Sequence, residues 1–216
     1  MDTSTHTHKK SKRGFTLTEI AIVLGIIGLI LGAIWVAASA VYNNLRTSRA
    51  TTELLQVAQA VRSMYATAAT VDAGANMTTI PFTAVAAGPQ TTYVQAGVFP
   101  TDMVAGAGPY TVTNPWGGSA NILSAQSTAA NDSFMILFDR VPQSACITMI
   151  TSNTGSGRDS SLYGVGAGAA AAFAVAAGGT TPGATSMPNF PITASTARTT
   201  CATANNNLAF QFRLKG

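Results

Sequence analysis

The sequence predicts an α+β protein in which a long N-terminal α-helix packs against a C-terminal antiparallel β-sheet. Two observations support this prediction. The stretch between Phe15 and Ile80 contains no proline, and it is uncharged at first and amphipathic later. Short apolar runs separated by Gly, Pro, Thr and Asn fill the rest of the chain, as strands and turns would. The 216 residues suffice for one globular domain and one extended element.

The first fourteen residues, MDTSTHTHKKSKRG, are polar and basic and have no apolar period, so residues 1–14 are interpreted as a targeting segment that is removed. Without them, the formal net charge of +4 falls to about +1, and no histidine is left. No basic patch then forms a footprint for nucleic acid, so direct nucleic-acid binding is not expected.

An uncharged run of 22 residues follows, from Ile20 to Val41. As a helix it measures about 33 Å, enough to cross the hydrocarbon core of a bilayer. The Lys and Arg residues just before it should keep its start on the cytoplasmic side, which sends the later residues outward. Residues 15–41 are therefore predicted to be a membrane-spanning helix.

Beyond Tyr42, apolar residues recur at spacings of three and four, which predicts an amphipathic continuation of the same helix over residues 42–69. The residues that form this stripe are Leu54, Val57, Ala58, Val61, Met64, Tyr65 and Ala68. Polar positions lie among them, at Glu53, Gln56, Gln59 and Arg62. The whole helix would reach about 55 residues, far above the globular norm, and would need support from neighbouring molecules.

Residues 70–216 are predicted to form the globular domain. The expected strands are Thr91–Val98, Tyr110–Thr113, Ser133–Phe138, Cys146–Ile150 and Leu208–Leu214. The last of these alternates apolar and polar residues, which indicates a half-exposed strand. The small-residue segment Gly164–Gly179 is expected to be a loop or a short Ala-rich helix.

The two cysteines, Cys146 and Cys201, lie far apart in the second half of the chain, and such a pair favours a disulfide over a metal site. The disulfide would indicate an oxidising compartment. A disulfide between the two cysteines would close the loop of residues that lies between them, and this would remove about 4 kcal/mol of unfolded-chain entropy. The alternative is a pair of buried free thiols.

The segment KKSKRGFTLTEIAIVLGIIGLILGAIW, which begins at Lys9, resembles the class III leader and helix start of type IV prepilins and of the related type II secretion pseudopilins. In that family, prepilin peptidase cuts after the glycine and methylates the new amine, which corresponds here to Gly14 and Phe15. TNPWGG at Thr113–Gly118 and the late cysteine pair resemble type IVb pilins of the thin-pilus kind that conjugative plasmids encode.

The resemblance implies a pilin fold and a structural role. The prepilin would sit in the inner membrane with its globular domain in the periplasm, and the pilus assembly machinery would then polymerise it into an extracellular homo-oligomeric filament. Adhesion, conjugation or a related surface function would follow. A minor pilin or a type II secretion pseudopilin is the alternative within the same class.

Glu19 lies at the edge of the apolar run, where a carboxylate is costly in lipid unless a partner compensates it. The helix dipole supplies part of that compensation, worth about 0.3 to 1 kcal/mol. The resemblance implies a stronger partner, the charged amine of Phe15 on an adjacent subunit, so that Glu19 would set the register during assembly. The alternative is a simple helix-start acid near the lipid headgroups.

Gly25, Gly28 and Gly32 provide small-residue spacings of three and four, which permit close helix packing in lipid. They could equally loosen the helix inside a filament.

Other functions have weaker support. Ala38–Ala40 reads A-x-A, so a signal peptidase that cut after Ala40 would release a soluble exported protein. An enzyme is not expected, because a chain that starts at Phe15 has no histidine and its only cysteines would be paired. The spacing of Asp132, Asp139 and Asp159 does not require a carboxylate pair, and no cofactor or metal is expected.

Overall fold

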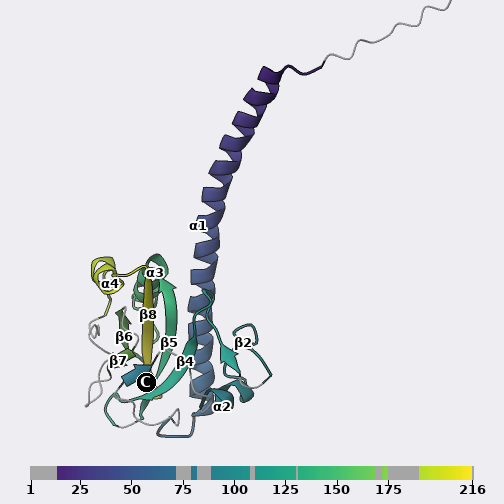
Figure 1. Ribbon diagram of the computed structural model, residues 1–216. Coiled ribbons are helices and arrows are strands. Elements are labelled where there is room, and N and C mark those ends of the chain that lie inside the picture. The colour runs from purple at the N-terminus through teal and green to yellow at the C-terminus, as the bar shows by residue number, and fades with distance from the viewer. Residues whose placement is uncertain are drawn as a thin grey trace, which may run out of the picture. The chain divides into compact units, whose positions relative to one another are not determined.

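The computed structural model describes residues 14–71, 79–81, 89–107, 110–129, 131–168, 172–174 and 190–215. It divides into two compact units, Met1–Tyr42 and Asn43–Gly216. Helix α1 (Leu17–Met64) contributes its first part to one unit and its second part to the other (Figure 1). The basic leader residues from Lys9 to Arg13 lie outside the described residues.

In the first unit, the large apolar side chains of α1 are exposed. Leu24, Leu31 and Trp35 have 63%, 60% and 79% of their surface exposed. This part of the helix is strongly apolar over 18 residues, and none of it is buried. By length and composition, α1 is the one helix among the described residues that can cross a membrane.

In the second unit, α1 buries one face. The fully buried residues on that face recur at helical spacing: Ala50, Leu54, Val57, Ala58 and Val61. The last four belong to the predicted stripe, whereas Met64, predicted to lie with them, is 41% exposed. The helix ends at Met64, short of residue 69. The Tyr65 amide still bonds four residues back, but those of Ala66 and Ala68 bond to carbonyls three residues back, in turn geometry.

The main sheet of the second unit has four antiparallel strands in the order β4-β5-β8-β6. Their bounds are β4 Ala120–Ala125, β5 Ser133–Pro142, β6 Leu162–Gly168 and β8 Asn205–Arg213. Ile136 of β5 lies opposite Ile122 of β4 and Phe210 of β8. This register brings the large apolar residues of three strands onto one face of the sheet.

That face belongs to the same buried core as α1. Phe134 and Phe212 stack with their ring centroids 5.7 Å apart, and they share the core with Leu54 and Val57 of the helix. The prediction of a long helix packed on an antiparallel sheet is therefore confirmed.

The opposite face of the sheet is also buried, which corrects the expectation that Leu208–Leu214 is half exposed. Met135, Leu137 and Ala209 form a second buried cluster there. Gln211, expected to face water, is 2% exposed, and its amide donates to the Gln126 carbonyl and to the Ser133 hydroxyl. A polar residue can be buried when its hydrogen bonds are satisfied, as those of Gln211 are. For this reason the alternating sequence pattern did not predict that the strand is covered on both faces.

Two expected strands are wrong, because both segments are helical. Cys146–Ile150 lies in α3 (Gln143–Asn153), which buries Ala145, Cys146 and Met149 at helical spacing. Its threonines favour a strand, but their hydroxyls bond to carbonyls one turn back and so fit the helix. The segment Thr91–Val98 begins inside α2 (Pro89–Gln95), where the proline occupies the first helical position.

The remaining elements are short. They are β1 (Thr79–Pro81) paired with β7 (Ala172–Ala174), β2 (Val104–Ala105) paired with β3 (Thr111–Val112), and α4 (Ala194–Thr200). The expected strand Tyr110–Thr113 is thus present as β3. Within Gly164–Gly179, residues 164–168 belong to β6 and Ala172–Ala174 to β7, so the loop and helix expectations are both wrong there; the remainder lies outside the described residues.

Candidate functional site

The start of α1 carries the residues that the sequence singles out, and they form a local hydrogen-bonded cap. The Glu19 carboxylate oxygen Oε2 accepts from the Thr16 amide at 2.8 Å and from the Thr16 hydroxyl at 2.9 Å. In return, Thr16 Oγ1 accepts from the Glu19 amide at 3.3 Å. This reciprocal arrangement is a capping box, which satisfies two amides at the helix start.

The cap determines where the carboxylate lies. Phe15, directly before Thr16, is 82% exposed, and it lines an apolar hollow beside Glu19 together with Ile20, Val23 and Leu24. The structure therefore places the predicted cleavage and assembly residues next to each other on the exposed end of the helix. Thr16 was not singled out by the sequence analysis, although the spacing T-x-x-E at 16–19 signals this cap.

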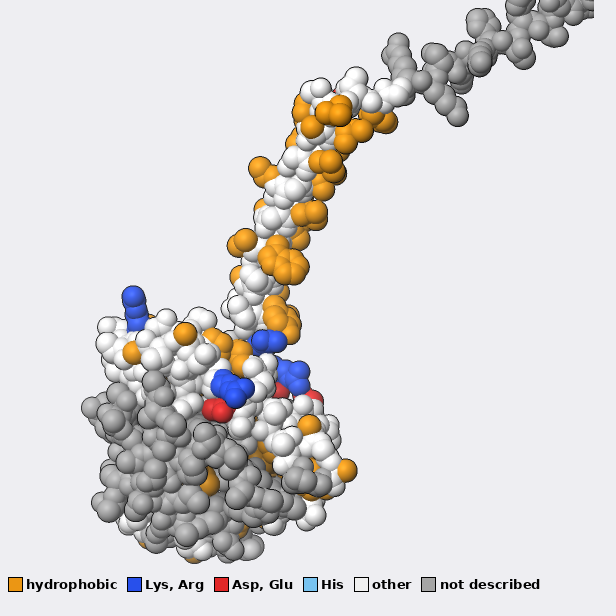
Figure 2. Space-filling view, viewed as in Figure 1, with side chains coloured by type: hydrophobic (Ala, Val, Ile, Leu, Met, Phe, Trp, Pro, Cys, Tyr) orange, Lys and Arg blue, Asp and Glu red, His pale blue; other side chains and the backbone are white. Residues whose placement is uncertain are grey.

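The three glycines of α1 do not serve the fold of the isolated chain. A Cβ added at Gly25, Gly28 or Gly32 would meet nothing within 4 Å. Figure 2 shows apolar side chains along this part of the helix, uncovered by the rest of the chain. Their role in packing against another helix stays a prediction.

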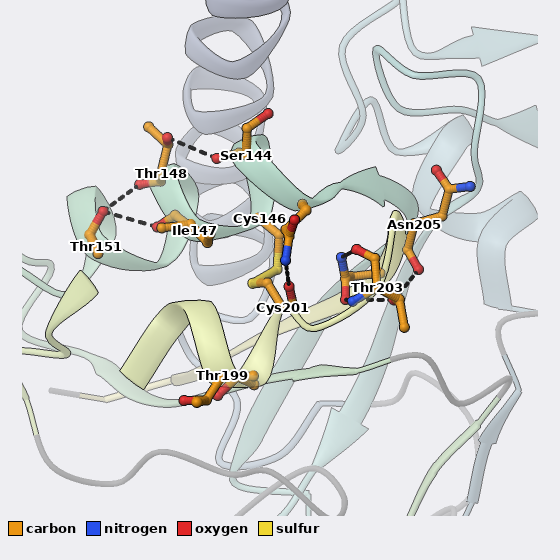
Figure 3. Close-up of a disulfide and its surroundings, with 12 residues drawn as sticks. Ser144, Cys146, Ile147, Thr148, Thr151, Thr199, Cys201, Thr203 and Asn205 are labelled. Carbon is orange, nitrogen blue, oxygen red and sulfur yellow. Dashed lines mark hydrogen bonds between the residues drawn. A yellow bond between two sulfur atoms is a disulfide. The ribbon is translucent and has the colours of Figure 1, made fainter. Parts of the chain in front are cut away.

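In the second unit, Cys146 and Cys201 form a disulfide, as predicted (Figure 3). The bond joins α3 to the end of α4 across a sequence separation of 55 residues, and both cysteines are fully buried. Beside it, the Gln143 side chain donates to the Cys201 carbonyl at 2.8 Å. The disulfide and this hydrogen bond fix the segment that leads directly into β8.

An ion-pair network on α1 was not expected from the sequence. Glu53, interpreted there as a polar-face residue, is 4% exposed, and its Oε1 accepts from Arg49 Nε at 2.8 Å. Arg49 also pairs with Asp102, in the turn that leads to β2. Burial raises the pKa of Glu53, and the hydrogen bond and charge of Arg49 only partly counter this. The spacing of four between Arg49 and Glu53 is the sequence signal that could have predicted this ion pair.

The three aspartates considered as a carboxylate group serve separate local structures. Asp132 accepts from the amides of residues 127–129, and Asp139 accepts from the amide of Ser119. Asp159 accepts from Ser161 and pairs with Arg62 at 2.8 Å. Within the described part of the chain, no group of three His, Cys, Asp or Glu residues is arranged to hold a metal ion.

The NPWGG segment forms a tight turn before β4. The Asn114 side chain accepts from the amides of Trp116 at 2.9 Å and Gly118 at 3.1 Å, and it donates to the Asp139 carbonyl at 2.6 Å. A Cβ at Gly118 would lie 2.1 Å from the Asp139 carboxylate, so only glycine fits. Trp116 is partly buried and packs against the main core.

Comparison with known proteins gives two family matches. Residues 9–35 match the prokaryotic N-terminal methylation motif, and residues 44–212 match the family described as PilS N terminal. Among curated proteins, no sequence matches this chain.

Two solved structures share the fold. A type IV b pilin from Salmonella typhi is 24% identical, with a TM-score of 0.52, over 77% of this chain and 99% of that one. TcpA, a type IV pilin from Vibrio cholerae El Tor biotype, is 20% identical, with a TM-score of 0.50, over 77% and 98%. At these identities, the likeness concerns the fold.

The methylation motif, the exposed apolar helix and the sheet domain define the class of protein: the chain is a pilin, a structural subunit of a pilus. Because the PilS match covers well over half of the sequence, the chain belongs to the PilS family of type IVb pilins. This is a family of structural subunits and not of enzymes.

Proposed function

We propose that this chain is made as an inner-membrane prepilin that is processed between Gly14 and Phe15 and then polymerised through α1. Residues 1–14 form the leader, and residues 15–41 hold the chain in the membrane. The second part of α1, up to Met64, provides the amphipathic helix, and the residues after it complete the globular domain, both on the periplasmic side. The proposal is supported by the methylation motif at residues 9–35, which contains both residues of the cleavage site.

The assembly step would use the charge that cleavage creates. Removing the leader gives Phe15 a free amine, which stays cationic after methylation. Glu19 is the one acidic residue on the exposed part of α1. In a subunit bundle with little water, the amine of one subunit and the Glu19 carboxylate of the next would attract each other strongly. The Thr16 cap would hold that carboxylate at the helix start until the partner arrives.

Burial gives the strongest physical support for polymerisation. A monomeric soluble protein rarely exposes an apolar patch larger than a few hundred Å². In the first unit, the large apolar residues from Phe15 to Tyr42 are at least 45% exposed. Lipid covers them in the membrane, and other subunits would cover them in a filament. Release by signal peptidase after Ala40 has less support, because that bond lies inside α1.

The processing step is tested by the N-terminus of the exported protein. Intact mass and peptide sequencing should show a methylated Phe15 as the first residue. If the first residue were Val41 instead, the proposed cleavage between Gly14 and Phe15 would be refuted, and the product would be a soluble exported domain. Electron microscopy of cells that carry Glu19→Ala tests the assembly step, with Glu19→Asp as the variant that keeps the charge.

A further inference from the structure

The second unit begins almost where the proposed membrane segment ends. Helix α1 continues without a break past Tyr42, and its first buried residue is Thr47, six residues after Val41. Six helical residues span about 9 Å, and the headgroup layer on each side of the hydrocarbon core is about 5 to 8 Å thick. The end of the domain around Thr47 therefore lies at the headgroups of the membrane that holds residues 15–41.

Two exposed aromatic side chains mark the same level of α1. Trp35 is 79% exposed and Tyr42 is 56% exposed. Trp and Tyr gather where a membrane meets water, because their rings are apolar and each carries one polar group. Trp35 lies near the end of the uncharged run, and Tyr42 follows it directly. This aromatic pair places the outer membrane interface just before the domain, independently of any charge.

Arg46 is the first charged residue after this interface. It follows Val41 by five residues, about 7.5 Å along the helix. Side chains of a helix point back towards its N-terminus, which here is the membrane, and the long apolar stem of arginine extends its reach. The guanidinium group binds phosphate through paired N–H donors. Arg46 is therefore placed to contact lipid phosphates.

Helices α3 and α4 form the same end of the domain, and neither has an acidic residue. Figure 1 shows both helices at the end of the second unit where its part of α1 begins, and the Cys146–Cys201 disulfide joins them. Arg198 is the one charged residue of the two helices, and it is exposed. Among the described residues, no carboxylate forms an ion pair with Arg198.

Exposed hydroxyl side chains accompany Arg198 on these helices. The Thr148 hydroxyl donates to the Ser144 carbonyl at 2.9 Å (Figure 3), and the Thr199 hydroxyl donates to the carbonyl of residue 196 at 2.8 Å. These side chains carry no charge that a phosphate layer would repel, and their hydroxyl protons are already used. We call Arg46, Arg198 and the exposed faces of α3 and α4 the arginine surface.

The acids that lie closest along the chain do not cancel this surface. Glu53 and Asp102 share Arg49, so these three side chains together carry at most one negative charge. Asp159, the one acid in the loop after α3, pairs with Arg62 at 2.8 Å, and no Asp or Glu follows it in the sequence. The two arginines of the arginine surface therefore leave this end of the domain with a net positive charge.

We propose that the arginine surface binds anionic phospholipid headgroups on the outer face of the inner membrane while the chain is a membrane-anchored subunit. The inference rests on the proposed insertion of residues 15–41, and it specifies which face of the domain turns to the bilayer and which lipids that face prefers. Because α1 is a short tether, the arginines stay within reach of the headgroups, so weak contacts suffice to orient the domain.

Quenching by labelled headgroups tests the contact. The full mature chain is inserted into vesicles of phosphatidylcholine, with or without phosphatidylglycerol, in which a few headgroups carry a nitroxide. The native cysteines are paired, so Thr148→Cys on α3 provides one site for a fluorophore. Quenching should be severalfold stronger with phosphatidylglycerol, and high salt should remove the difference because it screens exposed charges. The control label, Thr128→Cys, lies in the loop before β5, whereas α3 follows β5, and it should show no such difference.

Two arginines provide matched variants. Arg198 and Arg213 are both exposed, but β8 starts beside α4 and ends at Arg213, about 27 Å further along the strand. An arginine at an anionic membrane surface changes binding about fivefold. Arg198→Gln should therefore lower the ratio of docked to undocked domains about fivefold, while Arg213→Gln should leave it unchanged. Equal effects of the two variants would overturn the proposal.

The outcomes separate this proposal from the one on which it rests. Flotation with the vesicles shows whether the chain is inserted, and a chain that does not float would refute the insertion of residues 15–41 as well. A chain that floats but is quenched equally in both kinds of vesicle would refute the arginine surface alone. The same holds if the Thr148→Cys label is shielded only in assembled pili, since the surface would then contact another subunit and not lipid.

Discussion

The two halves of α1 obtain their burial from different sources. In the first unit, the large apolar side chains are exposed, whereas in the second unit Leu54, Val57 and Val61 are fully buried against the chain's own sheet. The first half thus depends on lipid or other subunits, and the second half depends on the domain. Substitutions in the first half should therefore leave the folding of the domain alone and act on assembly, while substitutions of the buried residues in the second half should destabilise the domain.

The largest expected effect is the loss of pili on substitution of Glu19, without a change in the folding of the domain. Glu19→Ala should abolish pili, because it removes the carboxylate that would pair with the neighbouring amine. The melting temperature of the detergent-solubilised domain should stay within about 1 °C of wild type, since Glu19 contacts only residues at the helix start. Pilus counts and circular dichroism measure the two effects. A large fall in the melting temperature would contradict the separation.

The disulfide should give the largest effect on folding. Replacing Cys146 and Cys201 together by serine should lower the free energy of unfolding by about 4 kcal/mol, because the unfolded chain regains the freedom of the closed loop. Denaturant unfolding measures this loss. Wild-type protein under reducing conditions is the control and should show a similar loss, while an unchanged midpoint in both would refute the estimate.

Two adjacent leucines provide the next test. Leu54 is fully buried and Leu55 is 37% exposed. Leu54→Ala should cost about 3 kcal/mol of unfolding free energy, because it leaves a cavity under the sheet. Leu55→Ala should cost less than about 1 kcal/mol in the same denaturant titration. Similar losses would show that the second half of α1 does not bury the face described here.

Asp159 should make the link between α1 and the loop before β6 sensitive to acid. Burial opposes ionisation, but the hydrogen bonds from Ser161 and Arg62 together lower its pKa below the usual value. Its contribution is therefore full above the ordinary aspartate pKa, near 4, and is lost as the pH falls through the lowered value. Asp159→Asn should cost about 1 to 2 kcal/mol at pH 7 and less at pH 3. Denaturation at both pH values tests this, and a deficit that does not change with pH would contradict it.

Glu53 should have the smallest effect on the free energy of unfolding, and its pH dependence should be opposite to that of Asp159. Its raised pKa means that its contribution to stability is full below the ordinary glutamate pKa and declines as the pH rises through the raised value. Relative to wild type, Glu53→Gln should therefore be more favourable at pH 7 than at pH 4, by less than about 1 kcal/mol. Arg49→Gln is the companion variant. It leaves the Glu53 charge without its cation, so it should be less stable at pH 7 than at pH 4.

Local pattern and spacing predicted the parts of the fold that depend on local chemistry. The helix followed from its periodicity and lack of proline, β5 and β8 from their apolar runs, and the disulfide from the isolated cysteine pair. The wrong predictions concern segments whose secondary structure is determined by contacts with residues distant in the sequence. The β-branched residues of α3 favour a strand in isolation, yet the segment folds as a helix against the core.

Other features were hidden for related reasons. β4 and β6 were not expected, because their small and polar residues, such as Asn121 and Gly166, give no strand signal of their own and gain order only by pairing with β5 and β8. Arg49, the partner of Glu53, also pairs with Asp102, about fifty residues later in the chain, so no local window shows the whole network. Two local signals were readable and were missed: the T-x-x-E spacing of the Thr16 cap and the spacing of four between Arg49 and Glu53.

The order of the strands also constrains how the domain is made. β8 is the last of the described elements, yet it lies between β5 and β6, and in the described sheet β6 pairs with no strand except β8. In chain order, β6 therefore precedes the strand that holds it by about forty residues. The sheet can close only once residues 205–213 are present, and Cys201 comes just before them in the chain. A chain cut short before residue 205 thus lacks the strand that joins β6 to β5, and it has two separate pieces of sheet in place of one.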